Sequence, residues 1–213
     1  MKNIALPMSE DTARSLRLGE MVTVSGPLFT GRSRFHIRAI TENIFPPLDF
    51  QAVNCFFHVG PVMRATPAGW EVVSCEPTSS IRFERYGAAV VRKFQLRTLI
   101  GKTTMGPCTA QALKEVGGVY LSKIGLSGNA LRDRIKAVRE VFFLDELGKT
   151  EATWVYEVDQ FGPFFVAIDA AGRNYFEQLA DDVHRALPEI ERSLGIPADY
   201  AYTDVNPERP GSR

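Results

Sequence analysis

Cationic side chains next to small hydroxyl residues form the clearest candidate site in this sequence. The loop Pro77-Thr78-Ser79-Ser80 is followed at once by Arg82, at the start of a segment with helical periodicity. Free backbone N–H groups at a helix start bind anions, and a guanidinium binds a carboxylate through two parallel hydrogen bonds. The stretch from Ser74 to Met105 is therefore predicted to form part of a site for a small anion.

Two further cations lie where predicted strands give way to loops. Arg32 follows Thr30-Gly31 and precedes a predicted helix that contains His36, and Lys102 ends a short apolar run. Glycine and small hydroxyl residues let a ligand approach the backbone, so the three cations together favour a doubly charged substrate such as a dicarboxylate. For each cation alone, an ordinary surface ion pair is the alternative.

Thr78 has two interpretations. A threonine before a helix is usually an N-cap, whose hydroxyl accepts a hydrogen bond from the first turn. Alternatively, the hydroxyl acts as a base, which requires nearby cations to stabilise the alkoxide. Arg82 lies one helical turn further along and Lys102 is a second candidate cation. The spacing does not decide between the two interpretations.

The histidines and cysteines form no recognisable metal-binding pattern. His36 could orient a substrate or be a half-buried structural residue, and His58, in an apolar run, is interpreted as structural. Three cysteines could hold an iron–sulfur cluster, but the apolar neighbours of Cys55 and Cys75 favour burial. No HxH or HExxH motif occurs, and residues 101–104, Gly-Lys-Thr-Thr, lack the upstream glycine of a phosphate-binding loop. We expect no metal held by this chain and no nucleotide site.

The composition is that of an ordinary globular chain. Its 213 residues allow one substantial core, and 25 basic residues balance 25 acidic ones, which argues against a nucleic-acid binder. No apolar run reaches the length of about 18 residues that spans a bilayer. The N-terminus turns acidic where an export signal would be apolar, so we expect a cytoplasmic protein.

Short strands alternating with helices predict a single mixed α/β domain over residues 1–195, followed by a flexible tail over 196–213. Pro188 is expected to kink or restart the last helix. The other expected helices cover 9–19, 33–42, 82–94, 107–115 and 129–138. The expected strands cover 21–24, 55–59, 70–74, 96–100, 119–121, 141–144, 153–158 and 164–168.

Four ordered blocks resemble one known family. They are LPMSEDTARSLRLGEMVTVSGPLFTGRSRFHIRA, GPVMRATPAGWEVVSCEPTSSIRF, LIGKTTMGPCTAQALKEVGGVYLSKIG and ELGKTEATWVYEVDQFGPFFVAIDAAGRNYF. They are similar to family segments that contain TARDxAH, GPTTSxRM, IGKGGM and LGMPEAxW. The family is that of the β subunits of iron–sulfur-dependent class I fumarate hydratase and L(+)-tartrate dehydratase, equivalent to the C-terminal domain of the single-chain enzymes.

This resemblance implies a function for each anchor residue. Arg32 falls on an arginine that contacts a substrate carboxylate, and Thr78 falls on the proposed proton-abstracting base. Arg82 and Lys102 fall on further substrate-binding residues, and His36 is an additional candidate substrate contact. The family also implies a swivelling β/β/α domain and a [4Fe–4S] cluster held by a partner α subunit, in a heterodimer or an α2β2 assembly. The cluster's open iron acts as a Lewis acid on the substrate hydroxyl.

Several departures from the family pattern lie near these anchors. Ser33 replaces an aspartate, Glu76 replaces a glycine, and Thr103 and Thr104 replace two glycines. They leave the choice of hydroxy dicarboxylate open. The hypothesis is a hydro-lyase β subunit. The alternatives are a non-catalytic dicarboxylate-binding or regulatory domain derived from the family, and an α/β domain with unrelated surface arginines.

Overall fold

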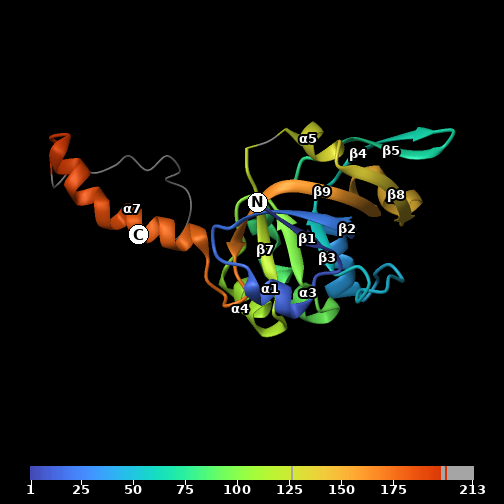
Figure 1. Cartoon of the computed structure of the whole chain (residues 1–213), viewed down its shortest axis with the longest axis horizontal. Helices are drawn as coiled ribbons and strands as arrows, with labels where there is room; N and C mark the ends of the chain where they lie inside the picture. The colour runs from blue at the N-terminus through green and yellow to red at the C-terminus, as the bar shows by residue number, and fades with distance from the viewer. Residues whose placement is uncertain (126, 198–199, 201–213) are drawn as a thin grey trace. The chain divides into compact units, whose positions relative to one another are not determined.

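The first part of the chain folds around a seven-stranded sheet in the order β1-β2-β3-β6-β7-β9-β8 (Figure 1). The computed structural model describes residues 1–125, 127–197 and 200. Contacts divide the chain into two units, Met1–Phe176 and a second that begins at Glu177. The strands are β1 Lys2–Ala5, β2 Met21–Gly31, β3 Cys55–His58, β6 Thr98–Gly101, β7 Val119–Lys123, β8 Ile135–Phe142 and β9 Thr153–Ile168.

Strands β1, β2, β3, β6 and β7 pair in parallel, whereas β9 pairs antiparallel with β7 and β8. Strand β2 also pairs antiparallel with β9, which closes β2, β3, β6, β7 and β9 into a ring. Successive strand residues point to opposite faces, so Cys55 and Phe57 of β3 join one core cluster while Phe56 joins the other. Burial on both faces explains why residues 55–57 of β3 are all apolar.

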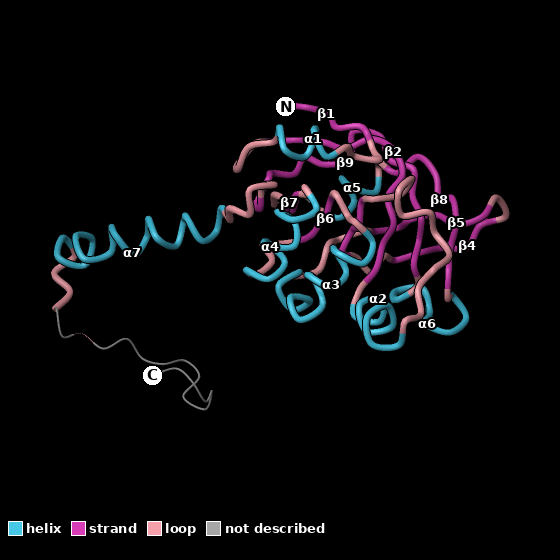
Figure 2. Tube along the Cα trace, turned by 90° about the horizontal axis from the view of Figure 1, so that it is seen from below, coloured by secondary structure: helices cyan, strands magenta, loops and turns pink. Residues whose placement is uncertain are grey.

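Helices α3 and α4 cover one side of the strands (Figure 2). The carboxylate of Glu84, the first residue of α3, accepts hydrogen bonds from the backbone N–H groups of Gly106 (2.8 Å) and Thr109 (3.0 Å) at the start of α4. The helices are α1 Glu10–Ser15, α2 Ser33–Ile37, α3 Glu84–Phe94, α4 Pro107–Val116, α5 Gly128–Arg132, α6 Leu144–Glu151 and α7 Tyr175–Ser193. A 3-10 helix spans Ser80–Phe83 and a π-helical turn spans Arg38–Glu42.

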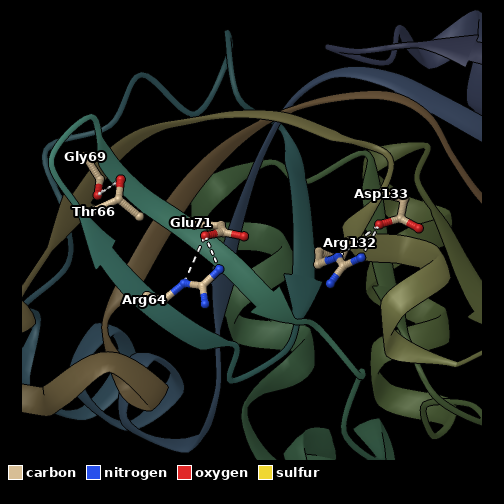
Figure 3. A network of polar contacts seen from close by, with 6 residues as sticks. All are labelled: Arg64, Thr66, Gly69, Glu71, Arg132 and Asp133. Atoms are coloured by element: carbon tan, nitrogen blue, oxygen red, sulfur yellow. Dashed lines mark hydrogen bonds and ion pairs between the residues drawn. The ribbon is translucent and has the colours of Figure 1, made fainter.

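A two-stranded hairpin, β4 Val62–Thr66 and β5 Gly69–Ser74, lies outside the main sheet. Figure 3 shows its cross-strand ion pair between Arg64 and Glu71 (2.6 Å), with the separate Arg132–Asp133 pair at the end of α5. A cavity of about 440 Å³ lies between β5 and β8. None of the predicted anchor residues lines it.

The mixed α/β architecture is confirmed, but some predicted elements are wrong. The strand expected over 141–144 ends at Phe142, because helix α6 begins at Leu144. The helix expected over 129–138 ends at Arg132, because Ile135–Phe142 pairs with β9 as strand β8. The strands expected over 153–158 and 164–168 are one continuous strand. Gly162 adopts a positive φ, which lets strand β9 continue through Gly162-Pro163. Strands β2 and β7, which flank β9 here, pair with it on both sides of this point.

Helix α7 runs unbroken through Pro188, and none of its described residues is buried. The tail expected over 196–213 lies almost wholly outside the described residues, and its flexibility stays a prediction, as does the 1–195 domain boundary. Among the helices that the structure describes, none combines the length and apolarity needed to cross a membrane.

Candidate active site

The anchor residues lie at one edge of the sheet because three parallel strands end there. Arg32 follows β2, and Lys102 follows β6, with β3 between these two strands. In the pairing register, Gly31 lies opposite His58, and Phe57 lies opposite Ile100. The carboxyl ends of parallel strands are a frequent ligand-binding position in α/β proteins.

The loop that carries Thr78 returns to this edge and is fixed between β3 and β6. The Thr78 N–H donates to the carbonyl of His58 (3.0 Å), and the Ser80 N–H donates to the carbonyl of Lys102 (3.2 Å). Isolated bridges join Pro77 to Val59 and Ser79 to Lys102. These backbone hydrogen bonds hold Thr78 beside the start of the Lys102 loop.

The Thr78 hydroxyl accepts a short hydrogen bond from the Arg82 guanidinium. The residue at the start of the following 3-10 helix is Ser79, and no described side chain caps that helix. The N-cap interpretation of Thr78 is therefore wrong. A guanidinium on the hydroxyl oxygen stabilises an alkoxide, which is what a threonine base requires.

Arg32 is half-buried and crosses the end of β3. A Cβ at Gly60 would overlap the Arg32 side chain, so only glycine leaves room for it. The Arg32 Nε lies 3.9 Å from Glu151 Oε1 and has no hydrogen-bond partner in the described part of the chain. Glu151 also accepts from the Arg34 N–H (3.0 Å). Sequence reasoning did not select Glu151, although it lies in a block that resembles the family.

His36 is completely buried, and its Nδ1 lies 2.8 Å from the Arg32 carbonyl. A carbonyl only accepts, so Nδ1 carries the proton and Nε2 is an unprotonated nitrogen, which has no partner among the described residues. Burial lowers the pKa of His36 to about 4, so the ring is neutral at pH 7. The ring stacks on Phe83 with centroids 4.5 Å apart. In this structure the imidazole supports Arg32 and does not reach solvent.

Glu76, the acidic departure from the family pattern, forms an ion pair with Lys123. The Lys123 side chain is only 6% exposed, so this pairing fixes the carboxylate against the end of β7. A cavity of about 410 Å³ adjoins Lys102 there, and another of about 200 Å³ lies beside Arg82 and Ser33. The extra negative charge next to the anion site is therefore neutralised locally.

The cysteines do not fit an iron–sulfur cluster. Cys55 and Cys75 are buried, as predicted, whereas Cys108 is exposed. Burial raises the pKa of the Cys55 thiol, and raises that of Cys75 to about 12, whereas iron ligation requires a thiolate. Within residues 1–125 and 127–197, no three His, Cys, Asp or Glu side chains lie close enough together to hold a metal ion.

Comparison with known proteins identifies the family of this chain. The family described as Fumarase C-terminus matches residues 1–179. A provisionally named L(+)-tartrate dehydratase subunit beta of Methanocaldococcus jannaschii is 30% identical over 86% of this chain and 95% of its own length. The L(+)-tartrate dehydratase subunit beta of Escherichia coli K12 is 29% identical over 81% of this chain and 85% of its own length.

A provisionally named fumarate hydratase class I of Geobacillus stearothermophilus is 38% identical over 88% of this chain, but over only 36% of its own length. The fold and the site therefore define one domain of a class that also occurs within longer chains. This chain belongs to the fumarase C-terminal-domain family, as a β subunit of the kind that the sequence motifs predicted.

Proposed function

We propose that this chain is the β subunit of a [4Fe–4S]-dependent hydro-lyase that reversibly dehydrates a small hydroxy dicarboxylate, of the malate/fumarate or tartrate/oxaloacetate type. The observation that carries the proposal is the contact between the Thr78 hydroxyl and the Arg82 guanidinium, at an edge shared with Arg32 and Lys102. The names of the relatives, which act on tartrate and fumarate, support the substrate class.

In the proposed mechanism, Arg32, Arg82 and Lys102 bind the two carboxylates and fix the substrate over the strand ends. Arginine supplies paired N–H donors to a carboxylate, whereas lysine supplies a point charge. Thr78, as the alkoxide stabilised by Arg82, takes the proton from the carbon next to a carboxylate. Neutral His36 holds the Arg32 backbone through its Nδ1–H and thereby orients the arginine.

In this proposal, the hydroxyl leaves from the side of the substrate that is turned away from these anchor residues. We assign that side to a partner α subunit in a heterodimer or an α2β2 assembly. A [4Fe–4S] cluster on the partner supplies Lewis-acid chemistry at the leaving oxygen. The names of two relatives as β subunits support a partner, and the swivelling type of domain and the cytoplasmic location stay predictions.

The test is to purify the chain with its α subunit, reconstitute the cluster without oxygen, and follow fumarate, malate and tartrate by absorbance. We expect turnover with the complex and none with this chain alone. If the complex binds a dicarboxylate in calorimetry but turns over no hydroxy dicarboxylate, the non-catalytic alternative is correct. If the complex neither binds nor converts any dicarboxylate, both interpretations are wrong.

A further inference from the structure

A buried polar cluster lies directly beneath the loop that carries Thr78. Ser80 is fully buried, and its Oγ lies 2.9 Å from Nδ1 of His58, which is 1% exposed. The Ser80 backbone N–H donates to the Lys102 carbonyl, and the hydroxyl of Tyr120 donates to the same carbonyl (3.2 Å). One serine therefore connects the ends of β3 and β6, and Tyr120 extends the cluster to β7.

The cluster fits tightly at Gly101, the residue before Lys102. A Cβ at this position would overlap both the Ser80 Oγ and the Tyr120 hydroxyl oxygen. The two hydroxyls thus fill the space that a side chain on β6 would need. A displacement of Ser80 or Tyr120 would therefore move Gly101, and with it the backbone of Lys102, which follows directly.

The groups of the cluster stay uncharged near neutral pH. Burial lowers the pKa of His58 well below its ordinary value, and His36, with its ring centroid 5.1 Å away, adds to this. Burial also raises the pKa of Tyr120, although its hydrogen bond with Ser80 opposes this. Hydrogen bonds between buried neutral groups of this kind fix geometry without placing a charge beside the substrate anion.

The cluster is connected to the backbone of Thr78 and to that of Lys102, the two residues to which the proposed reaction assigns a proton acceptor and a cation. The His58 carbonyl accepts from the Thr78 N–H, and the Lys102 carbonyl accepts from the Ser80 N–H. The Ser80 side chain closes this loop by contacting the His58 ring. Ser80 therefore links the backbone of Thr78 to the backbone of Lys102.

We propose that Ser80 is a positioning residue that fixes the Thr78 hydroxyl and the Lys102 ammonium relative to each other, with His58 and Tyr120 as its buried supports. This inference rests on the function proposed above, and it extends that function to residues that do not touch substrate. A displacement of about 1 Å at a reacting group costs up to about 100-fold in rate, so loss of this support should reduce turnover.

Ser80→Ala in the αβ complex tests the proposal. We expect kcat/KM to fall at least about 10-fold, mainly through kcat, because the base loses its alignment. Thr98→Val is the control: Thr98 is buried at the opposite end of β6 from Lys102, and its hydroxyl contacts Met8 Sδ (3.6 Å). This control should change kcat/KM less than about twofold.

A double-mutant cycle separates positioning from general destabilisation. If Ser80 acts through Lys102, then Ser80→Ala should cost much less in a Lys102→Ala background than in the wild-type complex. Equal costs in both backgrounds would overturn the proposal. If Ser80→Ala does not fold, Tyr120→Phe provides the same cycle, because it removes one donor to the Lys102 carbonyl and keeps the ring.

Amide hydrogen exchange on the chain alone gives a readout that does not depend on activity. In Ser80→Ala, exchange at the backbone amides of residues 78 and 80 should rise at least about 10-fold, while amides in β2 and β9 stay unchanged. Unchanged exchange at Thr78 would contradict the inference even if the complex proved inactive. Increased exchange with an inactive wild-type complex would instead contradict only the proposed function.

Discussion

At the scale of single residues, the proposed proton transfer depends on the contact between the Thr78 hydroxyl and the Arg82 guanidinium. In the αβ complex, we expect Thr78→Ala to lower kcat at least about 100-fold with a nearly unchanged KM, because it removes a proton acceptor and no substrate-binding group. Arg82→Ala should lower kcat and also raise KM, because the arginine both stabilises the alkoxide and binds a carboxylate. Steady-state kinetics measures both.

Ser79→Ala is the control for this pair of variants. Ser79 lies in the same loop, and within the described chain its side chain forms no helix cap. Its kinetics should match those of the wild type. A Thr78→Ala complex with full turnover would show that another group takes the proton.

Buried His36 makes stability depend on pH. Its folded pKa of about 4 lies below the ordinary histidine pKa of 6.5, so the unfolded chain binds more protons between these values. The His36 contribution is thus fully present above pH 6.5 and is lost as pH falls toward 4, at about 1.4 kcal/mol per pH unit and on the order of 3 kcal/mol in total.

Urea unfolding of the wild type and His36→Gln between pH 7 and pH 4 measures this contribution. His58 is present in both proteins, so the difference between the two curves reports His36 together with its effect on the pKa of His58. The wild type should lose more unfolding free energy on acidification than the variant. Parallel curves would mean that the His36 pKa is not depressed in the folded chain.

Thr103, next to the Lys102 anchor, has a φ of 65°, in the left-handed region that favours glycine. A non-glycine residue there costs about 1–2 kcal/mol, whereas glycine costs about 0.5–1 kcal/mol more in chain entropy. Thr103→Gly should therefore raise the free energy of unfolding by up to about 1 kcal/mol in urea titrations. Thr104→Gly is the control and should lower it, because the Thr104 hydroxyl bonds Asn174 (3.1 Å) and its φ is not positive.

At the scale of elements, Glu84 joins two helices that start 23 residues apart. Its carboxylate accepts three hydrogen bonds at the start of α4, including one from the Thr109 hydroxyl (2.6 Å). Hydrogen bonds to a charged group contribute about 1.5–3 kcal/mol, so Glu84→Ala should lower the unfolding free energy by about 2 kcal/mol or more. Glu115→Ala, which breaks only exposed contacts with Arg92 and Gln111, should cost clearly less. Equal losses in urea unfolding would contradict this assignment.

Local signals explain which elements the sequence predicted correctly. Helix α4 begins with Pro107 and ends before Gly117, and both residues have strong positional preferences. The first part of strand β8, residues 135–140, was missed because pairing with β9 stabilises a strand that its own Lys- and Arg-containing sequence does not favour. The same limit applies to the site. The cations of the site could be recognised from residue type and spacing. Ser80, Glu151 and Tyr120 could not, because their partners are distant in sequence.

At the scale of the whole molecule, the family match and the first structural unit end at nearly the same place. The match covers residues 1–179, and the first unit ends at Phe176. Phe176 itself contacts Phe165 of β9, with ring centroids 5.9 Å apart. Beyond it, Leu179, Val183 and Ile190 of α7 are 47–52% exposed. All the buried hydrophobic side chains among the described residues precede Glu177.

A chain truncated after Phe176 should accordingly keep its thermal midpoint within about 2 °C of the full chain, since about 1 kcal/mol corresponds to roughly 2–4 °C at this size. Calorimetry on both chains measures this. Val166→Ala in the full chain is the positive control: Val166 is fully buried in β9, and its loss should lower the midpoint by several degrees. A fall of similar size on truncation would mean that residues after 176 bury apolar surface of the first unit, and that the structural domain extends beyond the family match.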